Sequence, residues 1–229
     1  MLAGVSVTWY TWLEQGRRIN ASTDVLEALA RALRLDAAGR DHLLTLARDQ
    51  SPPDPVTHAP DALVRLIRAM EPAPAYVLGP RWEFLAWNRQ QALLYPGIER
   101  LDGIECNLLW AVFADPDAQS LIADWSVQAR RIMAEFRAGT ALLRSDPKVL
   151  ELVARLTDAS DEFAEWWRQA DVASFQTRVR RYTHPRAGTL VFEYQQLSAS
   201  EWPALRVVCQ LPVPGDDSAA RLAAWREIA

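Results

Sequence analysis

The residues with the clearest chemical use lie near the start of the chain, in the stretch GVSVTWYTWLEQGRR (residues 4–18). Ser6 is placed to cap a helix over residues 7–15, and Gly16 is placed to end it. Val5, Tyr10 and Leu13 have the spacing of an inner, packed face. The side chains left to meet base edges are Ser6, Val7, Thr8, Thr11 and Trp12, and those left to meet phosphates are Arg17 and Arg18. A turn followed by such a helix is the half of a helix-turn-helix that enters the major groove of DNA.

These residue types offer apolar contacts to DNA. Valine and threonine methyl groups contact thymine methyl groups and tryptophan stacks, whereas paired hydrogen bonds to bases come from arginine or glutamine. Two alternatives stay open: any short capped helix that ends in glycine has this spacing, and Trp9 could pack on a neighbouring helix. Charge does not favour DNA, because residues 1–50 hold as many acidic residues as arginines. The net charge of −4 gives the whole chain no general attraction to nucleic acid.

The elements around this stretch are expected to be helical. Ser22 or Thr23 can cap a helix with apolar residues at helical spacing, and Asp36 can cap the next one. Four prolines in RDQSPPDPVTHAP (48–60) then disfavour a helix and indicate a linker. We therefore expect a helical unit over 1–47, a linker over 48–60 and a larger domain over 61–229.

The larger domain has mixed periodicity. Helical spacing predicts a short helix over 61–70, one long helix from Asp117 onward, and further helices near Asp146 and Ser160. Alternation predicts strands over 75–78 and 82–87 and a three-strand antiparallel meander from Val172. The fold class is therefore α+β: a helical unit followed by a five-stranded antiparallel sheet with helices on a face.

Large apolar side chains of this domain could line a ligand cavity between the sheet and the helices. The candidates are Trp87, Leu109, Trp110, Phe113, Phe136, Phe192 and Tyr194, and Asn88 is a candidate polar anchor for a ligand. Ligand cavities are mostly apolar with a few polar anchors. The alternatives are that the aromatic residues only pack the core and that Asn88 caps the helix after its strand.

The remaining polar residues indicate no second chemistry. His184 is expected in a solvent-facing turn, with a ligand or pH-sensing role as the alternative. Arg178, Arg180 and Arg181 are expected on an exposed strand face. His42 and His58 are far from any cysteine pair, which argues against zinc. Cys106 and Cys209 are expected to be buried free thiols in a reducing cytoplasm.

No nucleophile motif, glycine-rich phosphate loop or metal-spaced set of ligands occurs in the sequence. We therefore expect no catalytic residues, metal or cofactor. No apolar run is long enough to cross a membrane, and the start of the chain does not have the pattern of a secretory signal.

The N-terminal residues 2–47 resemble the second half of a Cro/C1-type (XRE-family) helix-turn-helix. The matching pieces are the AGVS turn, the LEQGR helix end and the VLEALARALRL helix, in family order. The resemblance implies that the outward residues of the opening helix read an operator in double-stranded DNA, as a homodimer, because operators are commonly palindromic. The first helix and most of the second are absent from the match. We expect either a gene start upstream of Met1 or a ligand-sensing or protein-interaction module that has lost DNA binding.

The segment from residue 61 resembles the ligand-binding domain of MmyB-like transcription regulators, which has a PAS-like fold. The matching pieces are WEFLAWN, NLLWAVFADPDAQSLIADW, EFAEWW with ADV, and HPRAG. The resemblance implies a small apolar ligand, with a fatty acid among the candidates.

Overall fold

The computed structural model describes residues 11, 22–47, 56–169 and 178–228. Its α-helices are α2 (Thr23–Ala32), α3 (Ala37–Ala47), α4 (Asp61–Ala69), α5 (Arg89–Leu94), α6 (Leu108–Ala114), α7 (Pro116–Leu121), α8 (Trp125–Gly139), α9 (Pro147–Ala159), α10 (Asp161–Arg168) and α11 (Ser218–Ile228). Short 3₁₀ helices are η1 (Pro96–Arg100), η2 (Gly103–Glu105) and η3 (Ala141–Leu143). The strands are β1 (Ala75–Leu78), β2 (Phe84–Trp87), β3 (Arg178–His184), β4 (Gly188–Ala199) and β5 (Trp202–Pro212).

The five strands form one antiparallel sheet in the order β2-β1-β5-β4-β3. Both sheet connections predicted from alternation, the β1–β2 pair and the β3–β4–β5 meander, are confirmed. Strand β2 begins two residues later than expected, because Trp82 has a φ of 67° and closes a turn with Gly79. The predicted fold class, α+β with a five-stranded antiparallel sheet, is therefore correct.

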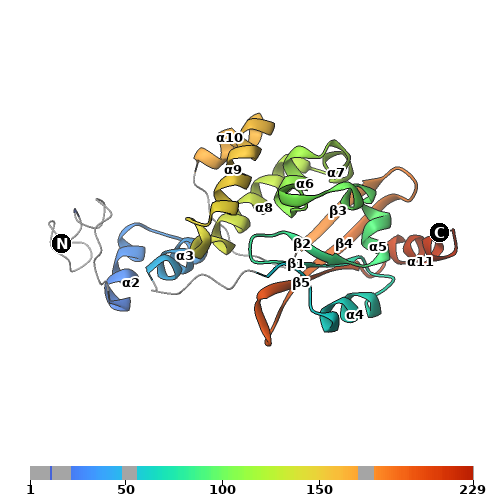
Figure 1. Ribbon diagram of the computed structural model, residues 1–229, viewed down its shortest axis with the longest axis horizontal. Coiled ribbons are helices and arrows are strands. Elements are labelled where there is room, and N and C mark those ends of the chain that lie inside the picture. The colour runs from blue at the N-terminus through green and yellow to red at the C-terminus, as the bar shows by residue number, and fades with distance from the viewer. Residues whose placement is uncertain (1–10, 12–21, 48–55, 170–177, 229) are drawn as a thin grey trace.

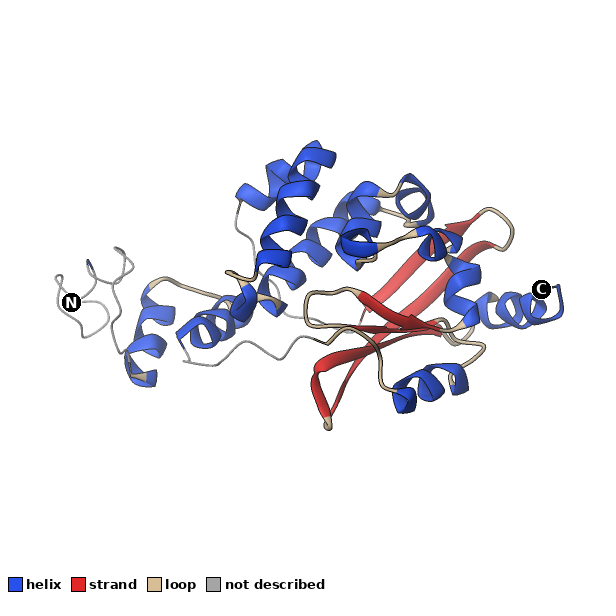
Figure 2. Cartoon of the chain, in the orientation of Figure 1, coloured by secondary structure: helices blue, strands red, loops and turns tan. Residues whose placement is uncertain are grey.

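The two faces of the sheet are covered unequally (Figures 1 and 2). Helix α4 packs on one face, where Leu63 and Ile67 meet Val77 and Val207. Helices α6 to α10 lie over the opposite face, which we call the inner face (Figure 1). Alternate residues of each strand point to opposite faces, so Tyr76 joins the core under these helices while its neighbour Val77 joins the core under α4.

Aromatic side chains hold the helices over the inner face together. Phe163 on α10 is fully buried and lies edge-to-face with Phe113 on α6, with ring centroids 5.1 Å apart. It also stacks on Trp167 of its own helix at 5.4 Å. Trp125 on α8 closes the group and donates its indole N–H to the carbonyl of Val112 over 2.8 Å. These aromatic residues join α6, α8 and α10 into one layer.

The helices before the linker have the expected caps. The Ser22 hydroxyl accepts from the Val25 N–H at the start of α2, and the Asp36 carboxylate accepts from the Gly39 N–H at the start of α3. Leu26, Leu29 and Ala30 of α2 are buried, and α3 packs against η3 of the larger domain. Figure 1 shows both helices at the end of the molecule opposite α11.

The single long helix predicted from Asp117 is wrong. The chain forms α7 and α8 with a break between them, where Asp124 adopts a left-handed conformation (φ 53°). At the break, Ile122 bridges to Tyr182 of β3, and the Ala123 N–H donates to the Arg181 carbonyl over 3.0 Å. Pairing with the sheet edge thus replaces helical hydrogen bonds, an effect that helical spacing alone does not reveal.

Candidate functional site

The predicted DNA-reading residues lie almost entirely outside the described residues. Ser6, Val7, Thr8, Trp12, Arg17 and Arg18 belong to this group. Thr11 is described, and it is helical and exposed. The contacts of these side chains with DNA stay predictions.

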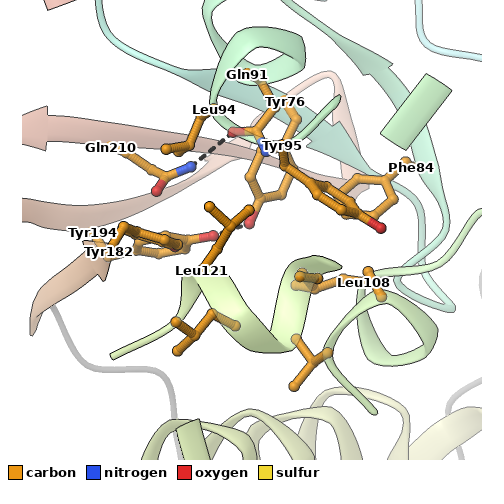
Figure 3. Close-up of a pocket in the computed structure, with 14 residues that line it drawn as sticks. Tyr76, Phe84, Gln91, Leu94, Tyr95, Leu108, Leu121, Tyr182, Tyr194 and Gln210 are labelled. Carbon is orange, nitrogen blue, oxygen red and sulfur yellow. Dashed lines mark hydrogen bonds between the residues drawn. The ribbon is translucent and has the colours of Figure 1, made fainter. Parts of the chain in front are cut away.

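A cavity lies between the inner face of the sheet and helices α5, α6 and α7 (Figure 3). Its free volume is about 50 Å³, which is room for roughly three to five water molecules. Each of the five strands contributes one lining residue: Tyr76, Phe84, Tyr182, Tyr194 and Gln210. The helices and the segments that follow α5 and α7 add Gln91, Leu94, Tyr95, Leu108, Ala111, Val112, Ala118, Leu121 and Ile122. Most of this lining is apolar, so the cavity suits an apolar group.

One end of the cavity carries the hydroxyl groups of the buried Tyr76 and Tyr194 and of the partly buried Tyr182. The hydroxyls of Tyr76 and Tyr194 are hydrogen-bonded to each other. Tyr182 on β3 also lines the cavity. Burial raises the pKa of Tyr76, Tyr182 and Tyr194 far above the ordinary tyrosine value. All three therefore keep their protons near neutral pH and present uncharged hydroxyl groups.

Two glutamines add amide groups to the same cavity. Gln210 on β5 lies directly opposite Tyr194 on β4, and its amide nitrogen donates to the Gln91 carbonyl oxygen over 2.8 Å (Figure 3). Gln210 is only 1% exposed, and no atom of the described residues forms a hydrogen bond with its side-chain oxygen. A buried acceptor without a partner is costly, so this oxygen indicates a place for a donor.

Of the predicted ligand-binding residues, Tyr194 is the one that lines this cavity. Leu109, Phe113 and Phe136 are fully buried in the core under the helices, and Trp87 and Trp110 pack on that core while partly exposed. Phe192 belongs to a separate small cluster with Leu94, Leu190 and Leu222. The structure thus does not bring these residues around one cavity, and ligand contacts by them stay predictions.

Asn88 joins three segments of the chain. Its side-chain oxygen accepts from the N–H groups of Gln91 (3.0 Å) and Ala75 (3.1 Å). Its side-chain nitrogen donates to the carbonyls of Ile67 (2.9 Å) and Ala73 (2.8 Å). Helix capping, the alternative considered from the sequence, is therefore present, and a ligand contact by Asn88 stays a prediction.

Tyr76, Gln91 and Gln210 line the cavity but were not predicted from the sequence. For Gln210, the sequence holds a signal that could have indicated a polar site. Gln210 interrupts the apolar run VVCQLP at a position whose side chain faces the helices. A polar residue on the buried side of a strand is expected to need a partner. The partner of Gln210 is Gln91 on α5, which is distant in sequence. The position of Gln210 therefore indicates that a polar site exists but does not indicate which other residues form it.

Two expectations about exposed residues are wrong. Arg180 is 6% exposed, because its position in β3 turns it to the inner face, where its guanidinium lies 3.8 Å from the ring centroid of Tyr194. Burial disfavours the charge of Arg180, but Tyr194, the other tyrosine oxygens and Glu135 favour it, so its pKa stays raised. His184 is also buried, because its Nδ1 accepts from the N–H groups of Arg186 and Ala187 and so closes the β3–β4 turn inward. Burial lowers the pKa of His184.

A second, larger groove of about 550 Å³ lies between η2 and α9. Ion pairs line its rim: Arg81 donates to Asp146 over 2.7 Å, and Arg155 donates to Glu105 over 2.7 Å. This groove has a polar rim, whereas the cavity under α5 is mostly apolar, so the cavity is the better candidate for an apolar ligand.

Three other findings concern the described residues. Among them, no group of histidine, cysteine and carboxylate side chains is arranged to hold a metal ion. None of the helices in this part of the chain is long and apolar enough to cross a membrane. Both cysteines are free thiols, and Cys209 is buried as expected. The expectation that Cys106 is buried is wrong, because it is partly exposed.

An antiparallel sheet with helices over one face and a small, mostly apolar cavity between them is an arrangement that can bind a small molecule. The family model described as the MmyB-like transcription regulator ligand binding domain matches residues 59–224, and the chain belongs to this family. A second family model, described as a helix-turn-helix domain, matches residues 1–43. No curated protein matches the chain. The chain is thus a helix-turn-helix transcription regulator with a ligand-binding domain, and neither matched family is an enzyme family.

Proposed function

We propose that this protein reads an operator in double-stranded DNA and changes its affinity when a small apolar molecule occupies the cavity under α5. The cavity carries this proposal, because all five strands contribute to its lining and most of the lining side chains are apolar. Its volume of about 50 Å³ favours a short ligand or the short end of a longer one, so a fatty-acid-like ligand would enter with few atoms.

The DNA contacts in this proposal come from the outward residues of the opening helix. Thr11 and Trp12 would meet base edges, and Arg17 and Arg18 would neutralise phosphates. We further propose that the active form is a homodimer, because two copies of one reading helix match a palindromic operator. The division into a DNA-reading unit (1–47), a linker (48–60) and a sensor domain (61–229) belongs to the same proposal.

Native mass spectrometry of the full chain, purified without denaturation, tests the proposal that a small molecule occupies the cavity. The expected result is a fraction of the protein that carries one small non-covalent molecule. The matched variant is Ala111→Met, because Ala111 lines the cavity from α6 and a longer side chain there fills the space. This variant should lose the added mass. The unaltered protein and the Ala111→Met variant could both carry no added mass, under ionisation conditions that preserve other non-covalent complexes. That result would contradict the proposal that the cavity is the ligand site.

A ligand-sensing or protein-interaction module without DNA binding is the second candidate. The observation that favours it is the charge of residues 1–50, where six arginines face six acidic residues. The arginines are residues 17, 18, 31, 34, 40 and 48, and the acidic residues are 14, 24, 27, 36, 41 and 49. A DNA-reading unit normally gains affinity from excess positive charge, so direct measurement of DNA affinity separates the two candidates.

A further inference from the structure

The cavity under α5 has a polar end whose hydrogen-bonding groups are not all used within the protein. Gln210 supplies an acceptor, since its side-chain oxygen is buried and has no partner among the described residues. Its amide nitrogen donates one of its two hydrogens to the Gln91 side-chain oxygen. A ligand that occupies this end would therefore satisfy the Gln210 oxygen by donating a hydrogen bond to it.

The tyrosine hydroxyls supply the complementary donor. The hydroxyls of Tyr76 and Tyr194 are hydrogen-bonded to each other, and either of them can be the donor. Each hydroxyl has a single hydrogen, so the hydroxyl that accepts in this pair keeps its own hydrogen available. Both tyrosines line the cavity.

The charges around the cavity favour a neutral ligand. Arg180 does not line the cavity, because its guanidinium lies against the ring face of Tyr194. The buried Glu135 acts on the same tyrosines with the opposite sign. The Asp115 carboxylate accepts the hydroxyl of the lining residue Tyr95 over 2.5 Å. None of the described residues that line the cavity is charged, so a charged group there would lose its hydration without an ionic partner in the lining, which is unfavourable.

We propose that the cavity binds a small uncharged alcohol, or the hydroxyl end of a longer one, which donates to the Gln210 side-chain oxygen and accepts from the hydroxyl pair of Tyr76 and Tyr194. This inference rests on the proposed function, because it names the chemical class of the ligand that the regulator senses. The hydroxyl group is favoured because it is small, neutral, and both a donor and an acceptor. The apolar part of the ligand would contact Leu94, Leu121 and Val112.

Three probes with a four-carbon skeleton test the inference on the full chain. Butan-1-ol donates and accepts, butan-2-one only accepts, and butyrate is charged at neutral pH. Binding is followed by titration in ¹H–¹⁵N NMR spectra, using the side-chain amide signal that disappears in Gln210→Met. The expected result is that butan-1-ol binds about fivefold more tightly than butan-2-one, the effect of one net hydrogen bond, and that butyrate binds more weakly than either.

Variants of two buried glutamines provide the control. Gln210→Met should reduce the preference for butan-1-ol over butan-2-one to about one, measured with backbone signals of α5. Gln90→Met makes the same change in a fully buried glutamine that does not line the cavity, so it should keep the full preference. An unchanged preference in Gln210→Met would overturn the assignment of the acceptor.

The outcomes separate this inference from the proposed function. If butyrate binds most tightly, the inference that the ligand is an alcohol is wrong, but the proposal of a regulator that senses a fatty acid stands. No binding by any probe shows a cavity that holds only water, and it overturns the inference together with the ligand part of the proposed function. A failure to bind DNA contradicts the proposed regulator, whereas the preference for butan-1-ol would stand.

Discussion

At the scale of single residues, Asn88 makes a larger contribution to stability than its place at the end of a short strand suggests. Its side chain uses two acceptor and two donor positions to join α4, β1 and α5, and it is 1% exposed. Asn88→Ala leaves buried N–H and C=O groups unpaired, so we expect a loss of about 3 kcal/mol or more in the free energy of unfolding. Urea denaturation of the full chain measures this loss, and a loss below about 1 kcal/mol would contradict the described network.

His184 predicts a dependence of stability on pH. Burial and the neighbouring Arg186 lower its pKa, and a hydrogen bond with the Leu93 backbone partly opposes them. The unfolded state therefore takes up the proton first, and stability should fall as the pH drops below about 6.5. His184→Asn retains an acceptor for the turn without a titrating group, so its stability should fall less between pH 7 and pH 5. Parallel curves of stability against pH for the two proteins would exclude His184 as the cause. The pH dependence would then come from a group present in both proteins, such as His42, whose pKa is also lowered by burial.

At the scale of the elements, the break between α7 and α8 is set by one left-handed residue. Asp124 has a φ of 53°, and no side-chain hydrogen bond caps α8 there. Asp124→Ala should cost about 1 kcal/mol, because alanine is strained in this conformation and favours a continuous helix. Asp124→Gly should be close to neutral, because glycine adopts a positive φ freely. Equal losses in both variants, measured by denaturation, would show that backbone strain is not the reason.

The same break shows what could be predicted from the sequence and what could not. Helical spacing correctly located the helices that begin near Asp146 and Ser160, and alternation located all five strands, because these signals are local. The break depends on pairing between Ile122 and Tyr182, which are distant in sequence. The cavity has the same origin: Gln91 and Gln210 meet only after the sheet has formed. Large aromatic residues therefore predicted the core rather than the cavity.

At the scale of the whole molecule, the proposed DNA contacts predict a change in salt dependence. The Arg17→Ala, Arg18→Ala double variant should bind the operator more weakly and lower the slope of log affinity against log salt by about 2, since each lost phosphate contact removes about 0.9. The matched control changes two arginines on α4, Arg65→Ala and Arg68→Ala, which are exposed on the opposite side of the sheet from α6–α10. If the control variant lowers the slope of log affinity against log salt by a similar amount, the cause is the loss of net positive charge rather than the loss of contacts by Arg17 and Arg18.

The central claim is that a molecule in the cavity controls the reading of DNA. The most direct measurement selects genomic DNA fragments with the full chain and then determines the affinity for the enriched fragment. The affinity is measured with protein freed of small molecules and again after adding back the organic extract of natively purified protein. We expect one enriched sequence and an affinity that changes at least fivefold with the extract, a change that Ala111→Met abolishes. The absence of an enriched sequence, or an affinity that the extract leaves unchanged, would contradict it.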